Sequence, residues 1–252
     1  MTLLAVERIK LFSTRSPWWC MALVVAFGVG FAALAAAFTD AQFPLSPQST
    51  QGGANFGQYV IMVMAAIAVT TEYRFGTIRA TFAAVPNRSA ALLAKTAVVA
   101  LLAGLVGLIS AFASWGVATL IAPGVDLAID TAQEWRGVAG VGLLFAVSAV
   151  LAVAVGILVR QTAAAVALLL VWALVVETVV AFLPRIGDDI GPWLPFGNGG
   201  NFLTAGDDVA SGAAAGFGVD YPFGPWGSLA YFAGFTLVLL AVSLVVAQRR
   251  DA

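Results

Sequence analysis

The side chains of this sequence that are able to do chemistry are few and are concentrated in one short stretch. Residues 70–96 (TTEYRFGTIRATFAAVPNRSAALLAKT) lie between two long apolar runs and carry five of the charges: Glu72, Arg74, Arg79, Arg88 and Lys95. A further acid, Glu177, lies inside a later apolar run. A carboxylate within an apolar run is costly unless it faces other helices or a polar cavity, so Glu177 is a candidate functional residue.

Several kinds of site are excluded by residues that the sequence lacks. It has no histidine and a single cysteine, Cys20, which excludes His-ligated haem or zinc, Ser-His and Cys-His nucleophile pairs, and an intrachain disulfide. It also lacks the G-x-x-x-x-G-K-[ST] loop that holds nucleotide phosphates, because neither lysine follows a glycine. No basic patch carries stacking aromatics, so a nucleic-acid partner is not expected. We therefore predict no bound cofactor or metal for this chain.

The composition is that of an integral membrane protein. Of the 252 residues, 61% are hydrophobic and 10% are charged, and the mean hydropathy is +0.97. A soluble domain carries about 25% charged residues. The lipid bilayer is thus the expected surrounding of most of the chain.

Six apolar stretches have the length of about 20 residues that a membrane-crossing helix needs, or nearly so. They cover about residues 18–38, 55–71, 90–121, 137–159, 162–183 and 227–247. The apolar run from 143 to 183 is too long for one span, so a tight turn is predicted at Arg160-Gln161. The first stretch exceeds the ~7–15 apolar residues of a signal peptide, which favours an uncleaved anchor. The predicted fold is an all-α, six-helix transmembrane bundle in a single domain, residues 1–252.

The charges orient this bundle. With the N-terminus in the cytosol, ten basic residues lie inside and only Arg136 and Arg185 lie outside, as the positive-inside rule requires. Both termini are then cytosolic, the segment 72–89 is a cytosolic loop, and the Gly-, Pro- and Asp-rich region 184–226 is external. The external aspartates match no calcium loop and are expected to be solvated.

The cytosolic loop has an apolar periodicity that topology alone does not require. Phe75, Ile78, Phe82 and Val85 are spaced as one stripe of a helix over residues 73–85, which Pro86 would end. One interpretation is an anchor that lies on the membrane surface and has no partner. The other is a docking helix, whose stripe packs on the spans or in a partner groove.

The order of the polar residues distinguishes these interpretations. Glu72, then Gly76-Thr77, then Pro86-x-Arg88 and Lys95 ("EYRFGT" and "PNRSAALLAK") resembles the cytosolic segment of ABC type-2 permeases, the membrane subunits of ATP-binding-cassette exporters. The six spans, the basic N-terminal segment, and the "VVET" and "WLPF" segments agree with the same family.

The resemblance implies an exporter permease in a bacterial plasma membrane. It implies a second permease, identical or homologous, and two separate ATPase subunits that hold the ATP and Mg²⁺. The residues that it assigns to ATPase coupling are Glu72, Tyr73, Arg74, Phe75, Gly76, Thr77, Ile78, Arg79, Phe82, Pro86, Arg88 and Lys95. Within this set we expect Glu72, Arg74 and Arg79 to meet the ATPase, and Gly76 to let a backbone approach or the chain bend.

Two alternatives remain open at the level of sequence. The chain is a transport subunit that is not itself an enzyme, or it is an ATP-independent membrane-embedded enzyme or scaffold. Glu177 contacts the transport pathway or a proton, or it is a structural residue, protonated and hydrogen-bonded to a neighbouring helix. The resemblance also implies short re-entrant helices in the external region, near Leu194-Pro195-Phe196 and Phe202-Leu203.

Overall fold

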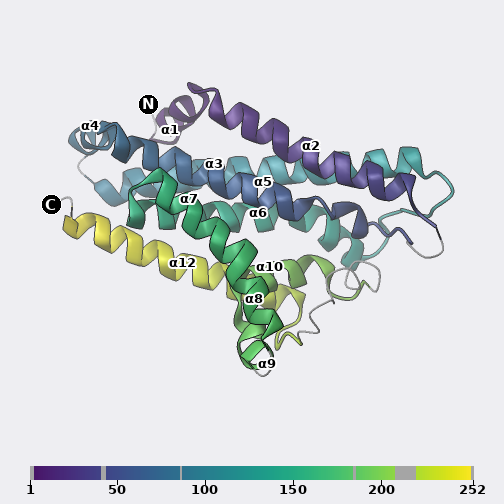
Figure 1. Cartoon of the computed structure of the whole chain (residues 1–252). Coiled ribbons are helices and arrows are strands. Elements are labelled where there is room, and N and C mark those ends of the chain that lie inside the picture. The colour runs from purple at the N-terminus through teal and green to yellow at the C-terminus, as the bar shows by residue number, and fades with distance from the viewer. Residues whose placement is uncertain (1–2, 41–43, 86, 184–185, 208–219, 251–252) are drawn as a thin grey trace.

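Every regular element in the described part of the chain is helical, and six of the helices are long and apolar enough to cross a membrane (Figure 1). The computed structural model describes all residues except 1–2, 41–43, 86, 184–185, 208–219 and 251–252. The first four spans are α2 (Ser16–Ala37), α3 (Ala54–Arg74), α5 (Arg88–Ile121) and α6 (Ala132–Val159). The fifth consists of α7 (Thr162–Val171), a π-helical turn (Trp172–Val176) and α8 (Glu177–Phe182), and the sixth is α12 (Pro225–Arg250). The prediction of six spans is confirmed, and they fit a multi-pass membrane protein.

The largest difference in span boundaries is at the start of α6, which begins at Ala132 rather than near residue 137. A capping box sets this start: the Thr131 hydroxyl accepts from the backbone N–H of Glu134, and the Glu134 carboxylate accepts from that of Thr131. The first turn is therefore polar, and a search for apolar residues alone misses it. At the other end of α6, Arg160 adopts a left-handed conformation (φ 61°) and α7 starts at Thr162, as the predicted tight turn requires.

Helix α6 lies at the centre of the bundle. Its most apolar 18-residue window is 72% buried, against 22% for α2, for the fifth span and for α12. Glycines bring α5 against it: a Cβ added at Gly107 would lie 3.0 Å from the Cα of Gly142. In lipid, where helices gain little from hydrophobic burial, such close approach is a main source of packing energy. The other spans are arranged around this pair.

Both termini lie at the same end of the bundle, which we call the basic end (Figure 1). Two short helices lie there as well, α1 (Leu3–Phe12) and α4 (Thr77–Ala84), together with the α6–α7 turn. The basic residues of this end whose side chains the structure describes are Arg8, Lys10, Arg15, Arg74, Arg79, Arg88, Lys95, Arg160 and Arg249. The arrangement is the one that six crossings require, whereas the cytosolic location of this end stays a prediction.

The opposite end holds α9 (Ile186–Ile190), a 3₁₀ turn (Gly191–Trp193) and α10 (Pro195–Thr204). The two short helical segments expected here belong to the single helix α10. Its Phe202 and Leu203 are buried against Gly140 of α6, so α10 packs into the end of the bundle. Its re-entry into a bilayer stays a prediction, and the stretch 208–219 lies outside the described residues.

Candidate functional site

Four charged side chains form a closed ring at the basic end. The Lys95 ammonium lies 2.5 Å from Glu7 Oε2 and 3.0 Å from Glu72 Oε1. The Lys10 ammonium lies 2.8 Å from Glu7 Oε1 and 3.3 Å from the same oxygen of Glu72. Acids and bases therefore alternate around the ring, and each charge has two neighbours of opposite sign.

The ring is buried and electrically neutral. Glu7 is 5% exposed, Lys95 6% and Glu72 8%, while Lys10 is half-buried. Burial alone would raise the pKa of the Glu7 carboxyl, but the Lys95 and Lys10 ammonium groups outweigh it and hold that pKa below its usual value. Burial would likewise lower the pKa of Lys10, but Glu7 and Glu72 raise it above its usual value. Both groups therefore remain ionised at neutral pH.

The ring joins three helices, and a hydrogen bond adds a fourth. Glu7 and Lys10 come from α1, Glu72 from the last turn of α3, and Lys95 from the second turn of α5. Lys10 also donates a hydrogen bond of 3.0 Å to the hydroxyl of Thr81 on α4. A buried charge has a strong preference for its partners, since leaving one unpaired costs several kcal/mol, roughly 3–5. Any movement of α4 or α1 is thus coupled to the ends of α3 and α5.

The expected single helix over residues 73–85 is wrong, because the chain bends in its middle. Helix α3 continues to Arg74, Gly76 adopts φ 71° in the left-handed region, and α4 starts at Thr77. A Cβ added at Gly76 would have no atom within 4 Å, so the glycine provides the bend and not the close approach of another backbone. Phe75, outside both helices, is 71% exposed and does not belong to the buried stripe.

We therefore predict that the conformation of Gly76, and not space, limits substitution. Gly76→Leu is expected to lower the free energy of unfolding by about 1–2 kcal/mol, because a Cβ disfavours the left-handed region. Gly76→Asn is the matched control and is expected to lose less, since asparagine tolerates this region. Thermal unfolding of both variants in the same detergent measures the difference. Equal losses would contradict the conformational explanation.

Helix α4 has one face on the bundle and another toward the surroundings. Ile78 is buried and Phe82 is half-buried, whereas Thr77 and Arg79 are exposed, as is Arg74 at the end of α3. Two cation–π contacts fix the edges of the segment: Arg88 lies 5.6 Å above the Phe82 ring, and Arg160 lies 5.0 Å above the Tyr73 ring. Pro86 lies outside the described residues.

The position of Glu72 differs from the expectation that it meets an ATPase. Its carboxylate faces inward to Lys10 and Lys95, and the exposed part of the segment includes Arg74, Phe75, Thr77 and Arg79. We call these four residues the docking surface. Glu72 and Lys95 are 23 positions apart in the sequence and form an ion pair that supports this surface from behind.

Glu177 binds the start of α10. Its carboxylate accepts hydrogen bonds from the backbone N–H groups of Phe196 (2.9 Å) and Gly197 (2.7 Å), and from the indole N–H of Trp172 (3.2 Å). A carboxylate at a helix N-terminus satisfies the N–H groups that have no partner within the helix. The geometry matches the structural interpretation of Glu177. Burial, together with the negative charge of Glu177, raises the pKa of the neighbouring Tyr221.

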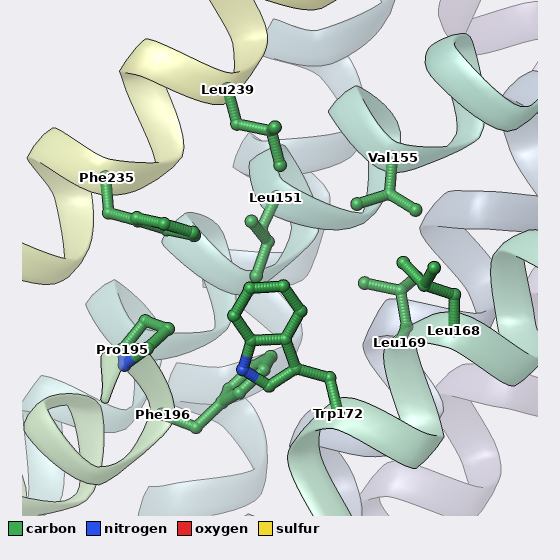
Figure 2. A pocket seen from close by; sticks show the side chains of 9 residues that line it. All are labelled: Leu151, Val155, Leu168, Leu169, Trp172, Pro195, Phe196, Phe235 and Leu239. Carbon is green, nitrogen blue, oxygen red and sulfur yellow. The ribbon is translucent and has the colours of Figure 1, made fainter. Parts of the chain in front are cut away.

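A small apolar pocket lies beside this contact, between α6, α7, α10 and α12. Figure 2 shows its lining: Leu151, Val155, Leu168, Leu169, Trp172, Pro195, Phe196, Phe235 and Leu239. The Trp172 ring points toward Leu151 and meets Phe235 edge-on, with 6.0 Å between the ring centroids. The pocket can accept an apolar group, and it provides no acid, base or nucleophile for catalysis.

Three residues of the ring site were not predicted from the sequence: Glu7, Lys10 and Thr81. The available signal was the spacing of Glu7 and Lys10, which lie three residues apart on the N-terminal helix and pair with each other. That spacing does not indicate that the pair faces inward, which depends on the packing of α1 against α5.

Comparison with known protein families finds no family model that matches this chain, and comparison with curated protein sequences finds no match.

Proposed function

We propose that this chain is the permease subunit of an ATP-binding-cassette exporter in a bacterial plasma membrane. It would work with a second permease and with two separate ATPase subunits, which bind ATP and Mg²⁺. The six spans and the order of Glu72, Gly76-Thr77, Arg88 and Lys95 support this proposal. The main observation in support of the proposal is the buried ring of charges behind the docking surface.

The ring supports docking over simple anchoring for a mechanical reason. A helix that only lies on the membrane needs an apolar face and a few basic residues, in any order. Here α4 is tied through Thr81 and Lys10 to the ends of α1, α3 and α5. A force applied by an ATPase to the docking surface would thus reach two membrane spans directly. Alternating access in this proposal begins with that joint movement.

The docking surface is suited to an acidic or carbonyl-rich groove on the partner. Arg74 and Arg79 are exposed, and the Arg74 guanidinium lies 5.5 Å above the exposed Phe75 ring. Aromatic and arginine side chains are the residues most often responsible for binding energy at protein interfaces. A guanidinium also makes paired hydrogen bonds with a carboxylate, which an ammonium cannot reproduce.

We predict that charge reversal on the docking surface releases the ATPase. The chain would be co-expressed with a tagged candidate ATPase, and the amount retained on purification would be measured. Arg79→Glu is expected to weaken retention at least about tenfold, because one unpaired charge at an interface costs on the order of 2–5 kcal/mol. Arg249→Glu, which reverses an exposed arginine at the end of α12, is the matched control and is expected to retain the ATPase.

Two outcomes would contradict this proposal. If Arg79→Glu retained the ATPase and transported normally, α4 would be an anchor. If the unaltered chain retained no ATPase and acted without ATP, the alternative of an ATP-independent membrane enzyme or scaffold would replace the transporter.

A further inference from the structure

At the basic end, lysines and arginines occupy different positions. Both lysines of the chain, Lys10 and Lys95, are used in the ring, where they neutralise Glu7 and Glu72. The exposed cations of this end are all arginines: Arg8, Arg15, Arg74, Arg79 and Arg249. In the described part of the chain, both acids of this end are buried in the ring, so the exposed surface carries positive charge only.

Two of these arginines, Arg8 on α1 and Arg15 just before α2, lie on either side of Phe12 in the sequence, and the Phe12 ring contacts exposed Trp18. Trp18 and Trp19, in the first turn of α2, are 57% and 70% exposed. Arg15 directly precedes α2, and Arg8 lies on α1. The Phe12 ring meets the Trp18 ring at 5.2 Å between centroids, which holds the end of α1 against the start of α2. We call Arg8, Arg15, Trp18 and Trp19 the α1–α2 junction.

The tryptophans define the depth of this junction in a bilayer. Tryptophan side chains concentrate at the boundary between headgroups and hydrocarbon. Arg15 is three residues before Trp18, a distance of about 5 Å along a helix, toward the aqueous side. The aqueous side of the tryptophans is also the side of the lipid phosphates. Arg8 lies on α1, whose last residue, Phe12, contacts Trp18. Leu4 and Ile9 on α1 are exposed as well.

We infer that the α1–α2 junction binds the phosphate of an anionic phospholipid headgroup, in the leaflet that the basic end faces. A guanidinium donates paired hydrogen bonds to a phosphate, and the absence of an exposed acid among the described residues of this end leaves the attraction unopposed. A lipid fits better than a soluble protein partner, because Trp18 and Trp19 belong to a membrane span and a soluble protein would have to enter the headgroup layer. The inference requires only a membrane-inserted chain and does not depend on an ATPase.

The test uses the full chain purified in a neutral detergent. It is titrated with phosphatidylglycerol or with phosphatidylcholine of the same acyl chains, and bound lipid is counted by native mass spectrometry. The unaltered chain is expected to prefer phosphatidylglycerol. One arginine near an anionic surface contributes roughly fivefold in affinity, so Arg8→Gln/Arg15→Gln is expected to reduce phosphatidylglycerol binding about 25-fold.

The matched control is Arg79→Gln/Arg249→Gln, which removes the same charge from the same end and is expected to change binding less than threefold. Thermal unfolding checks that both double variants are folded, as expected for exposed side chains. Equal losses in the two double variants would overturn the inference, because net charge alone would then attract the lipid. Equal binding of the two lipids by the unaltered chain would also overturn it. The inference would also be overturned if glycerol phosphate displaced phosphatidylglycerol at concentrations similar to those of the lipid, because the site would then recognise free phosphate.

Discussion

Replacing Lys95 with leucine is expected to lower the free energy of unfolding by about 3–5 kcal/mol, because Glu7 and Glu72 would then share one ammonium group in a buried site. Glu72→Leu is expected to cost a similar amount, since it leaves two lysines with one carboxylate. The double variant Glu72→Leu/Lys95→Leu removes one charge of each sign and leaves the Glu7–Lys10 pair intact. It is therefore expected to unfold within about 1 kcal/mol of the unaltered chain.

Denaturant unfolding in mixed micelles, followed by intrinsic fluorescence, would measure this double-mutant cycle. Arg79→Leu provides the control for a loss of charge on the exposed side of α4 and is expected to change stability by less than about 0.5 kcal/mol. If the losses of the two single variants added up in the double variant, the charges would not be coupled, and the ring would not act as a unit.

The same double variant separates folding from function. It keeps the link between α1 and α4, because Lys10 still reaches Glu7 and Thr81, but it disconnects the ends of α3 and α5. On the proposed function, it is expected to bind the ATPase and permit ATP hydrolysis while transport falls at least about tenfold. Normal transport by a folded double variant would show that the ring has a structural role only.

Replacing Glu177 with leucine is expected to destabilise the protein by at least about 3 kcal/mol. The N–H groups of Phe196, Gly197 and the Trp172 indole would each lose their acceptor, and an unsatisfied buried donor costs about 1–3 kcal/mol. Glu177→Gln keeps one acceptor oxygen and is expected to lose about 1–3 kcal/mol. Asp189→Asn removes a charge from an exposed position on α9 and serves as the control, with a change of less than about 0.5 kcal/mol.

Stability and transport measured together decide the role of Glu177. If Glu177 has a structural role, stability and transport are both expected to fall, more in Glu177→Leu than in Glu177→Gln. If Glu177→Gln abolished transport without changing thermal unfolding, Glu177 would act in the pathway or in proton transfer. If Glu177→Leu unfolded like the unaltered chain, the hydrogen bonds to α10 would be of no consequence for the fold.

The amino-acid sequence by itself determined the number of spans and the common end of the two termini. A helix in lipid must satisfy its backbone groups within itself, so apolar length alone identifies a span. The turn at Arg160-Gln161 follows from the same reasoning, since the run from 143 to 183 is too long to cross once. The chemistry and spacing of residues 72–95 likewise located the segment that contributes Glu72 and Lys95 to the charged ring, whereas Glu7 and Lys10 come from α1.

The tertiary structure alone decided which of those charges face inward. Glu72 meets Lys10 across 62 positions of sequence, and Glu177 meets the start of α10 across 19. Hydropathy is a property of each residue and its near neighbours, whereas an ion pair or a cap depends on how separate helices pack. The left-handed turn at Gly76 rotates α4 relative to α3, which exposes Phe75 while Ile78 is buried. A stripe of residues read along one continuous helix does not reveal that rotation. The sequence therefore indicated Glu72 and Lys95, but not Glu7 and Lys10, nor the ring that the four residues form.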